Sequence, residues 1–168
     1  MFKNLIKQNQ LAFIILTILF LIDRFSKFFI LKLVEQGEKL DIYITSYLNL
    51  YLIWNKGIAF GLLSFNENII YNIITVLILI IIFTILIMVV KSKGFVKYSL
   101  VAVLAGALGN VFDRIYYSAV PDFIDFHINE FHWFIFNIAD IFVTIGVFCL
   151  IYVELFINKE IKNNEKNY

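Results

Sequence analysis

Long apolar stretches constrain this chain more than any other feature of its sequence. Residues Ile69–Val90 contain no charged side chain, and a helix needs roughly 20 apolar residues to cross the hydrocarbon core of a bilayer. The whole chain is 61% hydrophobic, whereas soluble domains are usually about 45–50% apolar. The sequence therefore predicts an integral membrane protein.

Four apolar stretches predict four transmembrane helices in a single domain that covers residues 1–168. Only the second stretch is free of charge, and the other three are interrupted by acidic or basic residues. Such residues are costly inside a bilayer and usually face a bundle interior or a cavity. The predicted spans run over about residues 11–34, 69–90, 98–117 and 136–157.

Lysine and arginine are unevenly distributed between the connecting segments. Lysines precede the first span, join the second to the third, and follow the fourth, whereas residues 118–135 contain no Lys or Arg. Because basic residues collect on the cytoplasmic side, we expect both termini there and the segments 35–68 and 118–135 outside. Within the first outer segment, Leu40–Trp54 alternates partially and predicts a short sheet or an interfacial element.

The polar residues of the spans fall at one depth. The first and third spans run outward, so at 1.5 Å per residue their polar residues lie roughly 18–24 Å from the inner ends. Asp140 lies about one turn below the outer end of the fourth span, and Asp122 lies in the short loop beyond the third. We therefore expect one polar cluster in the outer half of the bilayer. Its members on the first and third spans are Asp23, Lys27, Asn110, Asp113 and Arg114.

Most of this cluster has a structural explanation. Asp23 and Lys27 are four residues apart and share a helix face, so we interpret them as a structural ion pair. Asp113 and Arg114 could form a buried ion pair, or their charged ends could extend to the membrane–water interface. We favour a structural role for both, in which Arg114 steadies another carboxylate.

Two further pairs of polar residues also have structural explanations. Asn110 and Asn137 are expected to form hydrogen bonds between helices. His127 and His132 fall in an outer loop without a matching set of metal ligands. We therefore predict no metal site.

Asp122 and Asp140 do not fit a structural explanation. Neither has a basic partner four residues away, and both lie where lipid meets water. Pro121, the only proline, fixes the backbone immediately before Asp122. Two carboxylates that share a site cannot both ionise cheaply, so one keeps a proton while the other acts as a base. The pair predicts a metal-free aspartyl peptidase.

Five sequence blocks resemble the bacterial lipoprotein signal peptidase family, also called signal peptidase II, across almost the whole chain. Each block alone is a weak signal, but together they follow the order of the family in a chain of the family's length. The blocks are Asp23–Lys27, Asn55–Gly61, Gly106–Arg114, Asp122–Asp125 and Phe136–Asp140.

The resemblance implies an all-α membrane fold of four helices with a small periplasmic β-sheet and an interfacial helix. It implies an inner-membrane endopeptidase that removes the signal peptide from diacylglyceryl-modified prolipoproteins, cutting just before the lipid-modified cysteine. The expected partners are these precursors, membrane lipid and cyclic peptide inhibitors of the globomycin type. We expect a monomer with no cofactor and no nucleic-acid partner.

The resemblance also assigns site residues. Asp122 and Asp140 match the two catalytic aspartates. The positions implied to line the site or to support it are Asp23, Lys27, Asn55, Gly57, Asn110, Asp113, Arg114 and Asn137. The chain departs from the family pattern at Ser118, Pro121 and Phe134, where Gly, Val and Pro are common, and these departures bear on the geometry of the loop around the first aspartate.

The main alternative is a non-enzymatic membrane protein, either a small transporter or an assembly subunit. A transporter would carry polar residues through to the cytoplasmic side, and the inner halves of the spans offer few. The Gly-x-Gly-Asp pattern of other intramembrane aspartyl proteases is absent. Ser26 and Lys27 are adjacent on a helix and diverge, which argues against a serine–lysine peptidase.

Overall fold

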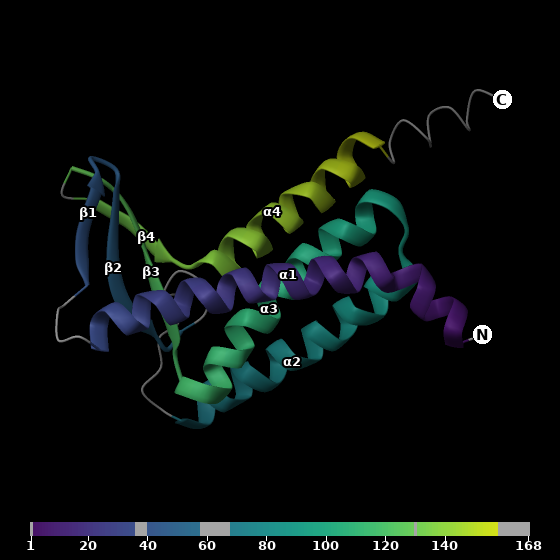
Figure 1. The fold of residues 1–168 in the computed structure, drawn as a ribbon, viewed down its shortest axis with the longest axis horizontal. Helices are drawn as coiled ribbons and strands as arrows, with labels where there is room; N and C mark the ends of the chain where they lie inside the picture. The colour runs from purple at the N-terminus through teal and green to yellow at the C-terminus, as the bar shows by residue number, and fades with distance from the viewer. Residues whose placement is uncertain (1, 36–39, 58–67, 130, 158–168) are drawn as a thin grey trace.

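The computed structural model describes residues 2–35, 40–57, 68–129 and 131–157. Within these ranges the chain forms four long helices and one antiparallel sheet (Figure 1). The helices are α1 (Phe2–Glu35), α2 (Asn68–Lys91), α3 (Gly94–Tyr117) and α4 (Ile138–Tyr152), the last continued by a π-helical turn, η2 (Val153–Ile157).

The sheet is built from two hairpins that lie far apart in the sequence. Its strands, β1 (Asp41–Thr45), β2 (Leu48–Asn55), β3 (Val120–Ile128) and β4 (Phe131–Phe136), stand in the order β1-β2-β3-β4. The β2–β3 pairing joins the two hairpins across α2 and α3. Figure 1 shows the sheet at one end of the bundle, where α1 and α3 end and where α2 and α4 begin.

Among the residues that the structure describes, three helices are long and apolar enough to cross a membrane: α2 from Tyr71, α3, and α4 with η2. These match the predicted second, third and fourth spans. Helix α1 is longer than its predicted span but carries charged residues along its second half, and it is not among the three. The described ranges contain no separate interfacial helix, and residues 58–67 lie outside them.

Helix α3 forms the centre of the bundle. Within an apolar stretch of 18 residues, 50% of α3 is buried inside the protein, compared with 11% for α2 and 17% for α4. Gly106 allows α4 to approach closely, because a Cβ atom there would clash with the backbone carbonyl of Ala139. Gly146 does the same on α4, where a side chain would meet the backbone of Ser99. The small residues of the sequence therefore set the α3–α4 distance.

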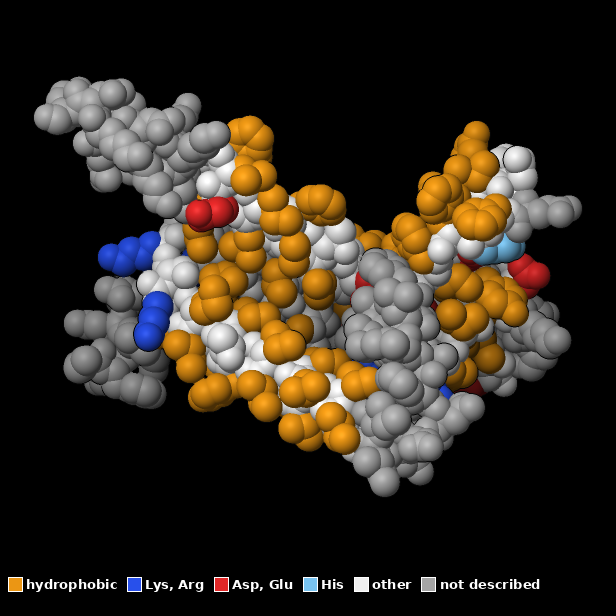
Figure 2. Space-filling view, turned by 180° about the vertical axis from the view of Figure 1, so that it is seen from behind, with side chains coloured by type: hydrophobic (Ala, Val, Ile, Leu, Met, Phe, Trp, Pro, Cys, Tyr) orange, Lys and Arg blue, Asp and Glu red, His pale blue; other side chains and the backbone are white. Residues whose placement is uncertain are grey.

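The outward faces of the helices are apolar. Large side chains on α2, such as Ile73, Val76 and Phe83, are more than half exposed. Figure 2 shows hydrophobic side chains spread over the helical part of one face, with most of the visible basic side chains at the end away from the sheet. Exposed apolar surface of this extent is typical of helices in contact with lipid. The protein is therefore a multi-pass membrane protein.

Candidate active site

Asp122 lies at the start of β3, close behind the end of α3. Helix α3 ends at Tyr117, and its C-cap residue Ser118 takes a left-handed conformation with φ of 57°. This conformation favours glycine, which explains why the family pattern prefers Gly at the position of Ser118. Pro121 pairs with Trp54 of β2, and Asp122 pairs with Ile53. The prediction of a loop at Asp122 is therefore wrong: β2 binds this segment as a strand.

The Asp122 carboxylate is held by two side-chain amides. It is 1% exposed. Asn55 Nδ2 donates to Oδ2 over 2.8 Å, and Asn137 Nδ2 donates to Oδ1 over 2.6 Å. Burial, and then the nearby charge of Asp140, raise the pKa of Asp122 to about 6. A carboxyl group in this range exchanges its proton near neutral pH.

Asp140 occupies the third position of α4, in a capping box. The backbone N–H of Asp140 donates to Asn137 Oδ1 over 3.2 Å, and the backbone N–H of Asn137 donates to Asp140 Oδ2 over 3.1 Å. An Asn followed three residues later by an acidic residue is a known signal for a helix start. Asn110 Nδ2 donates to the other oxygen, Oδ1, over 2.8 Å. Both oxygens of Asp140 are thus oriented.

Asn137 joins the two aspartates. Its side chain donates to Asp122 while its backbone donates to Asp140, and it is fully buried. Both carboxylates line one cavity of about 150 Å³ between α2, α3, β3 and α4. Its other walls come from Asn55, Ile78, Ala107, Asn110, Arg114, Val120 and Val143.

A buried ion cluster lies on the α1 side of Asn110. Lys27 Nζ lies 3.0 Å from Asp23 and 2.6 Å from Asp113. Arg24 binds the same two carboxylates, Asp113 over 2.5 Å through Nη1 and Asp23 over 2.5 Å through Nη2. Two cations and two anions balance within the cluster, so it is electrically neutral overall.

The ion cluster orients Asn110 toward Asp140. Lys27 Nζ donates to Asn110 Oδ1 over 2.9 Å, and an ammonium group can only donate. The amide nitrogen of Asn110 must therefore point the other way, to Asp140. Asp23 also accepts from the backbone N–H of Ala139 over 3.1 Å, which ties α1 to the start of α4.

A second series of contacts orients Asn55 toward Asp122. The backbone N–H of Gly57 donates to Asn55 Oδ1 over 2.7 Å, which leaves the Asn55 amide nitrogen facing Asp122. Arg114 Nη2 donates to the carbonyl of Gly57 over 2.5 Å. Asn55, Asn110 and Asn137 thus each accept a hydrogen bond at oxygen and donate one to a carboxylate from nitrogen.

Arg114 forms no ion pair with a carboxylate among the residues that the structure describes, so its role in steadying one stays a prediction. Arg114 donates to the Gly57 carbonyl, and its guanidinium carbon lies 5.6 Å from the Tyr71 ring centroid. Asp113 binds Lys27 and Arg24 instead. Successive helix residues diverge by about 100°, which separates Arg114 from Asp113.

Sequence reasoning missed Arg24 and the surroundings of the histidines. Arg24 lies within the sequence block Asp23–Lys27. Its pairing with Asp113 could not be predicted from that block, because the pairing requires α3 to pack against α1. His127 and His132 stand on β3 and β4, not in a loop, and lie opposite each other in register. The sequence feature that could have predicted this grouping is the spacing of Asp125 and His127, because residues two apart on a strand share one face.

The fold is similar to that of solved membrane enzymes. Two solved structures described as a bacterial membrane enzyme studied by the in meso method align with TM-scores of 0.71 and 0.69, each at 29% identity. They cover 87% and 88% of this chain, and 88% and 94% of their own chains. The fold of this chain therefore groups it with integral membrane enzymes.

The sequence comparisons give the family. The signal peptidase (SPase) II family model matches residues 15–156. A lipoprotein signal peptidase from Pelagibacter ubique is 55% identical over 162 residues, 96% of this chain and 97% of the relative. One from Anaplasma phagocytophilum is 37% identical over 89% of this chain and 94% of the relative. The chain belongs to the signal peptidase II family and is a protease.

Proposed function

We propose that this protein is a lipoprotein signal peptidase in which Asp122 and Asp140 form the catalytic pair. It removes the signal peptide from diacylglyceryl-modified prolipoproteins and cuts just before the lipid-modified cysteine. The observation that carries the proposal is that Asn137 binds both carboxylates at the wall of one cavity.

The proposed reaction uses the two carboxyl groups in opposite protonation states. The ionised one takes a proton from water, and the water oxygen attacks the scissile carbonyl carbon. The other gives its proton to the carbonyl oxygen, and the tetrahedral intermediate then breaks its C–N bond as the leaving nitrogen is protonated. The raised pKa of Asp122, about 6, supports a shared proton between the two groups.

The proposed membrane arrangement has four spans, with α1 as the first. Helix α1 contains 34 residues, and its charges at Asp23, Arg24 and Lys27 turn inward onto α3 and the start of α4. We place both termini on the cytoplasmic side of the inner membrane and the sheet with the dyad on the periplasmic side. This arrangement lets the acyl chains stay in lipid while the scissile bond reaches water. We further propose that the protein acts as a monomer and binds globomycin-type cyclic peptides.

The threonine hydroxyls of α2 argue against a transport path. Thr75 donates to the carbonyl of Tyr71 over 3.0 Å, and Thr84 donates to that of Ile80 over 2.9 Å. Each hydroxyl is therefore used within its own helix. A polar route across the bilayer would need such groups to face a shared channel.

The test is cleavage of a purified precursor in detergent or proteoliposomes. A diacylglyceryl-modified precursor should yield one product beginning at the lipid-modified cysteine, identified by mass spectrometry. The same precursor without lipid is the matched control and should be cleaved at least tenfold more slowly. A globomycin-type peptide should block cleavage. Equal cleavage of both precursors, or cleavage at another bond, would contradict the proposed specificity.

A further inference from the structure

A second cluster of ligand-type side chains lies on the sheet, apart from the aspartate pair. Asp125, His127 and His132 each offer a ligand atom, and these atoms all lie within 4.8 Å of one another. Asp125 and His127 are two residues apart on β3, and His132 stands opposite His127 on β4. The chain contains only two histidines, and both belong to this cluster.

The distances inside the cluster are close to those of a metal site. His132 Nδ1 lies 2.7 Å and His127 Nδ1 lies 3.6 Å from the same carboxylate oxygen, Asp125 Oδ2. Ligand atoms around a tetrahedral Zn²⁺, at 2.0–2.2 Å from the ion, lie roughly 3.3 Å apart. A small opening of the His132–Asp125 pair and a small closing of the His127–Asp125 pair would give this geometry.

The cluster also contains buried polar atoms without partners. Asp125 Oδ1 and His127 Nδ1 form no hydrogen bond with any residue that the structure describes, although the Asp125 side chain is only 2% exposed. Asn49 Oδ1 is buried without a partner in the same ranges, and Asn49 pairs with Asp125 across β2 and β3. Unsatisfied buried polar atoms are costly, and a cation bound between Asp125 and His127 would give both of these side chains a partner.

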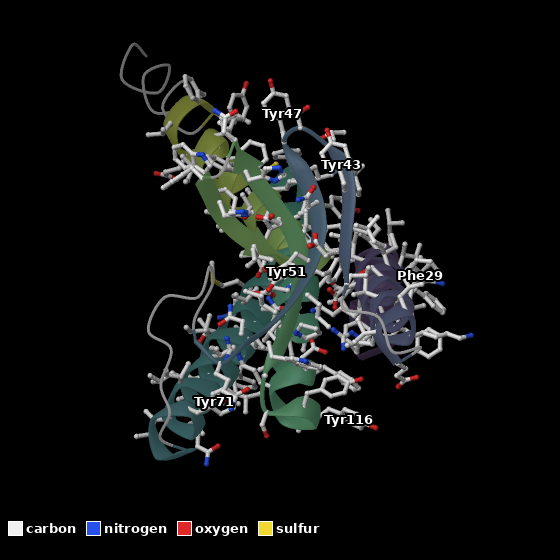
Figure 3. All side chains as sticks on the ribbon, turned by 90° about the vertical axis from the view of Figure 1, so that its left-hand side faces the viewer. Phe29, Tyr43, Tyr47, Tyr51, Tyr71 and Tyr116 are labelled. Carbon is white, nitrogen blue, oxygen red and sulfur yellow. The ribbon has the colours of Figure 1, made fainter. Side chains whose placement is uncertain are left out.

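The cluster is accessible from outside. Asp125 and His132 line a cavity of about 490 Å³ whose walls include Asp41, Asn49 and Tyr51. The His132 side chain is 55% exposed. Figure 3 shows Tyr43 and Tyr47 near the turn between β1 and β2, with Tyr51 further along β2. An ion can therefore reach the cluster without entering the bundle.

We propose that Asp125, His127 and His132 form a zinc site, with Asn49 Oδ1 or water as the fourth ligand. Two imidazoles and a carboxylate suit Zn²⁺ better than Mg²⁺ or Ca²⁺, which prefer oxygen ligands only. The ion cross-links β3 to β4. Because β3 begins beside Asp122 and β4 ends beside Asn137, this link stiffens the segment that connects the two aspartates. The proposal does not depend on the proposed function.

The test is metal binding by the full-length protein in detergent, purified without a histidine tag. Titration with Co²⁺ should give one equivalent with the visible absorption of a four-coordinate ion, and Zn²⁺ should displace it. Zn²⁺ should also raise the unfolding temperature. H132Q and H127Q should each weaken binding at least tenfold, and H132Q changes an exposed side chain that the fold tolerates. D41N, in the same cavity but outside the cluster, should bind like the wild type.

Two results would overturn the proposal. One is the absence of the Co²⁺ spectrum and of any Zn²⁺-dependent rise in unfolding temperature at millimolar metal. The other is binding that H132Q and H127Q leave unchanged but that D122N abolishes, which would assign the ion to the aspartate pair.

Discussion

The side-chain amide of Asn137 donates a 2.6 Å hydrogen bond to Asp122, while the oxygen of the same amide caps α4 at Asp140. One residue thus starts a helix and connects the two carboxylates. Because the two tasks use different atoms of Asn137, substitutions can separate them.

Replacing Asn137 should separate stability from activity. N137S keeps an oxygen that can cap α4 but has no nitrogen to reach Asp122, so it should lose only the buried hydrogen bond, about 1–3 kcal/mol in the free energy of unfolding. N137A loses the cap as well and should lose about 1 kcal/mol more. Both should lower kcat by about a hundredfold because Asp122 loses a donor at the reacting centre. Thermal unfolding and precursor cleavage measure the two effects, and an active N137S would refute the positioning role.

Replacing Asn55 should move the pH dependence of cleavage. The Asn55 amide favours the charged form of Asp122 and so lowers its pKa, against the larger effect of burial. N55L removes this donor, so Asp122 should keep its proton to higher pH. The limb of the pH profile that reports the ionisation of Asp122 should therefore shift upward. A shift to lower pH, measured as kcat/KM, would contradict this account.

Replacing Lys27 should reveal the balance of the buried ion cluster. K27M leaves Asp23 and Asp113 with Arg24 alone and should cost about 3–5 kcal/mol in the free energy of unfolding. The double variant K27M/D113N restores neutrality and should recover most of that loss. Unfolding in detergent gives the comparison. If the double variant were as unstable as K27M, packing rather than charge would explain the cost.

Replacing Ser118 should stabilise the protein. Its φ of 57° costs an ordinary residue about 1 kcal/mol relative to glycine. S118G should therefore raise the free energy of unfolding by up to about 1 kcal/mol. N129G is the matched control: Asn129 also has a positive φ, of 54°, but Asn tolerates this region, so its gain should be smaller. Destabilisation by S118G would show that the serine side chain contributes to the turn.

The sequence predicted the features of the fold that depend on one segment at a time. The charge-free stretch Ile69–Val90 indicated α2 within a residue or two at each end, and the partial alternation in Leu40–Trp54 indicated strands. Counting 1.5 Å per residue placed Asp23 and Asn110 at one depth, and the Lys27 contacts join them.

Features that depend on contacts between segments were harder to predict. The partner of Asp113 could not be read from its own helix, because Arg24 and Lys27 reach it from α1. The strand at Asp122 depends on β2, about 70 residues earlier in the chain. The grouping of His127 with His132 depends on the register of the β3–β4 hairpin.

The most direct measurement is precursor cleavage by D122N and by D140N, each purified and shown by its unfolding curve to be folded. Loss of either carboxylate should reduce kcat by at least a thousandfold, because the one carboxyl group that remains cannot act as acid and base at the same time. D41N, an exposed carboxylate on β1, should cleave at the wild-type rate. Ordinary turnover by a folded D122N or D140N variant would contradict the paired-aspartate mechanism.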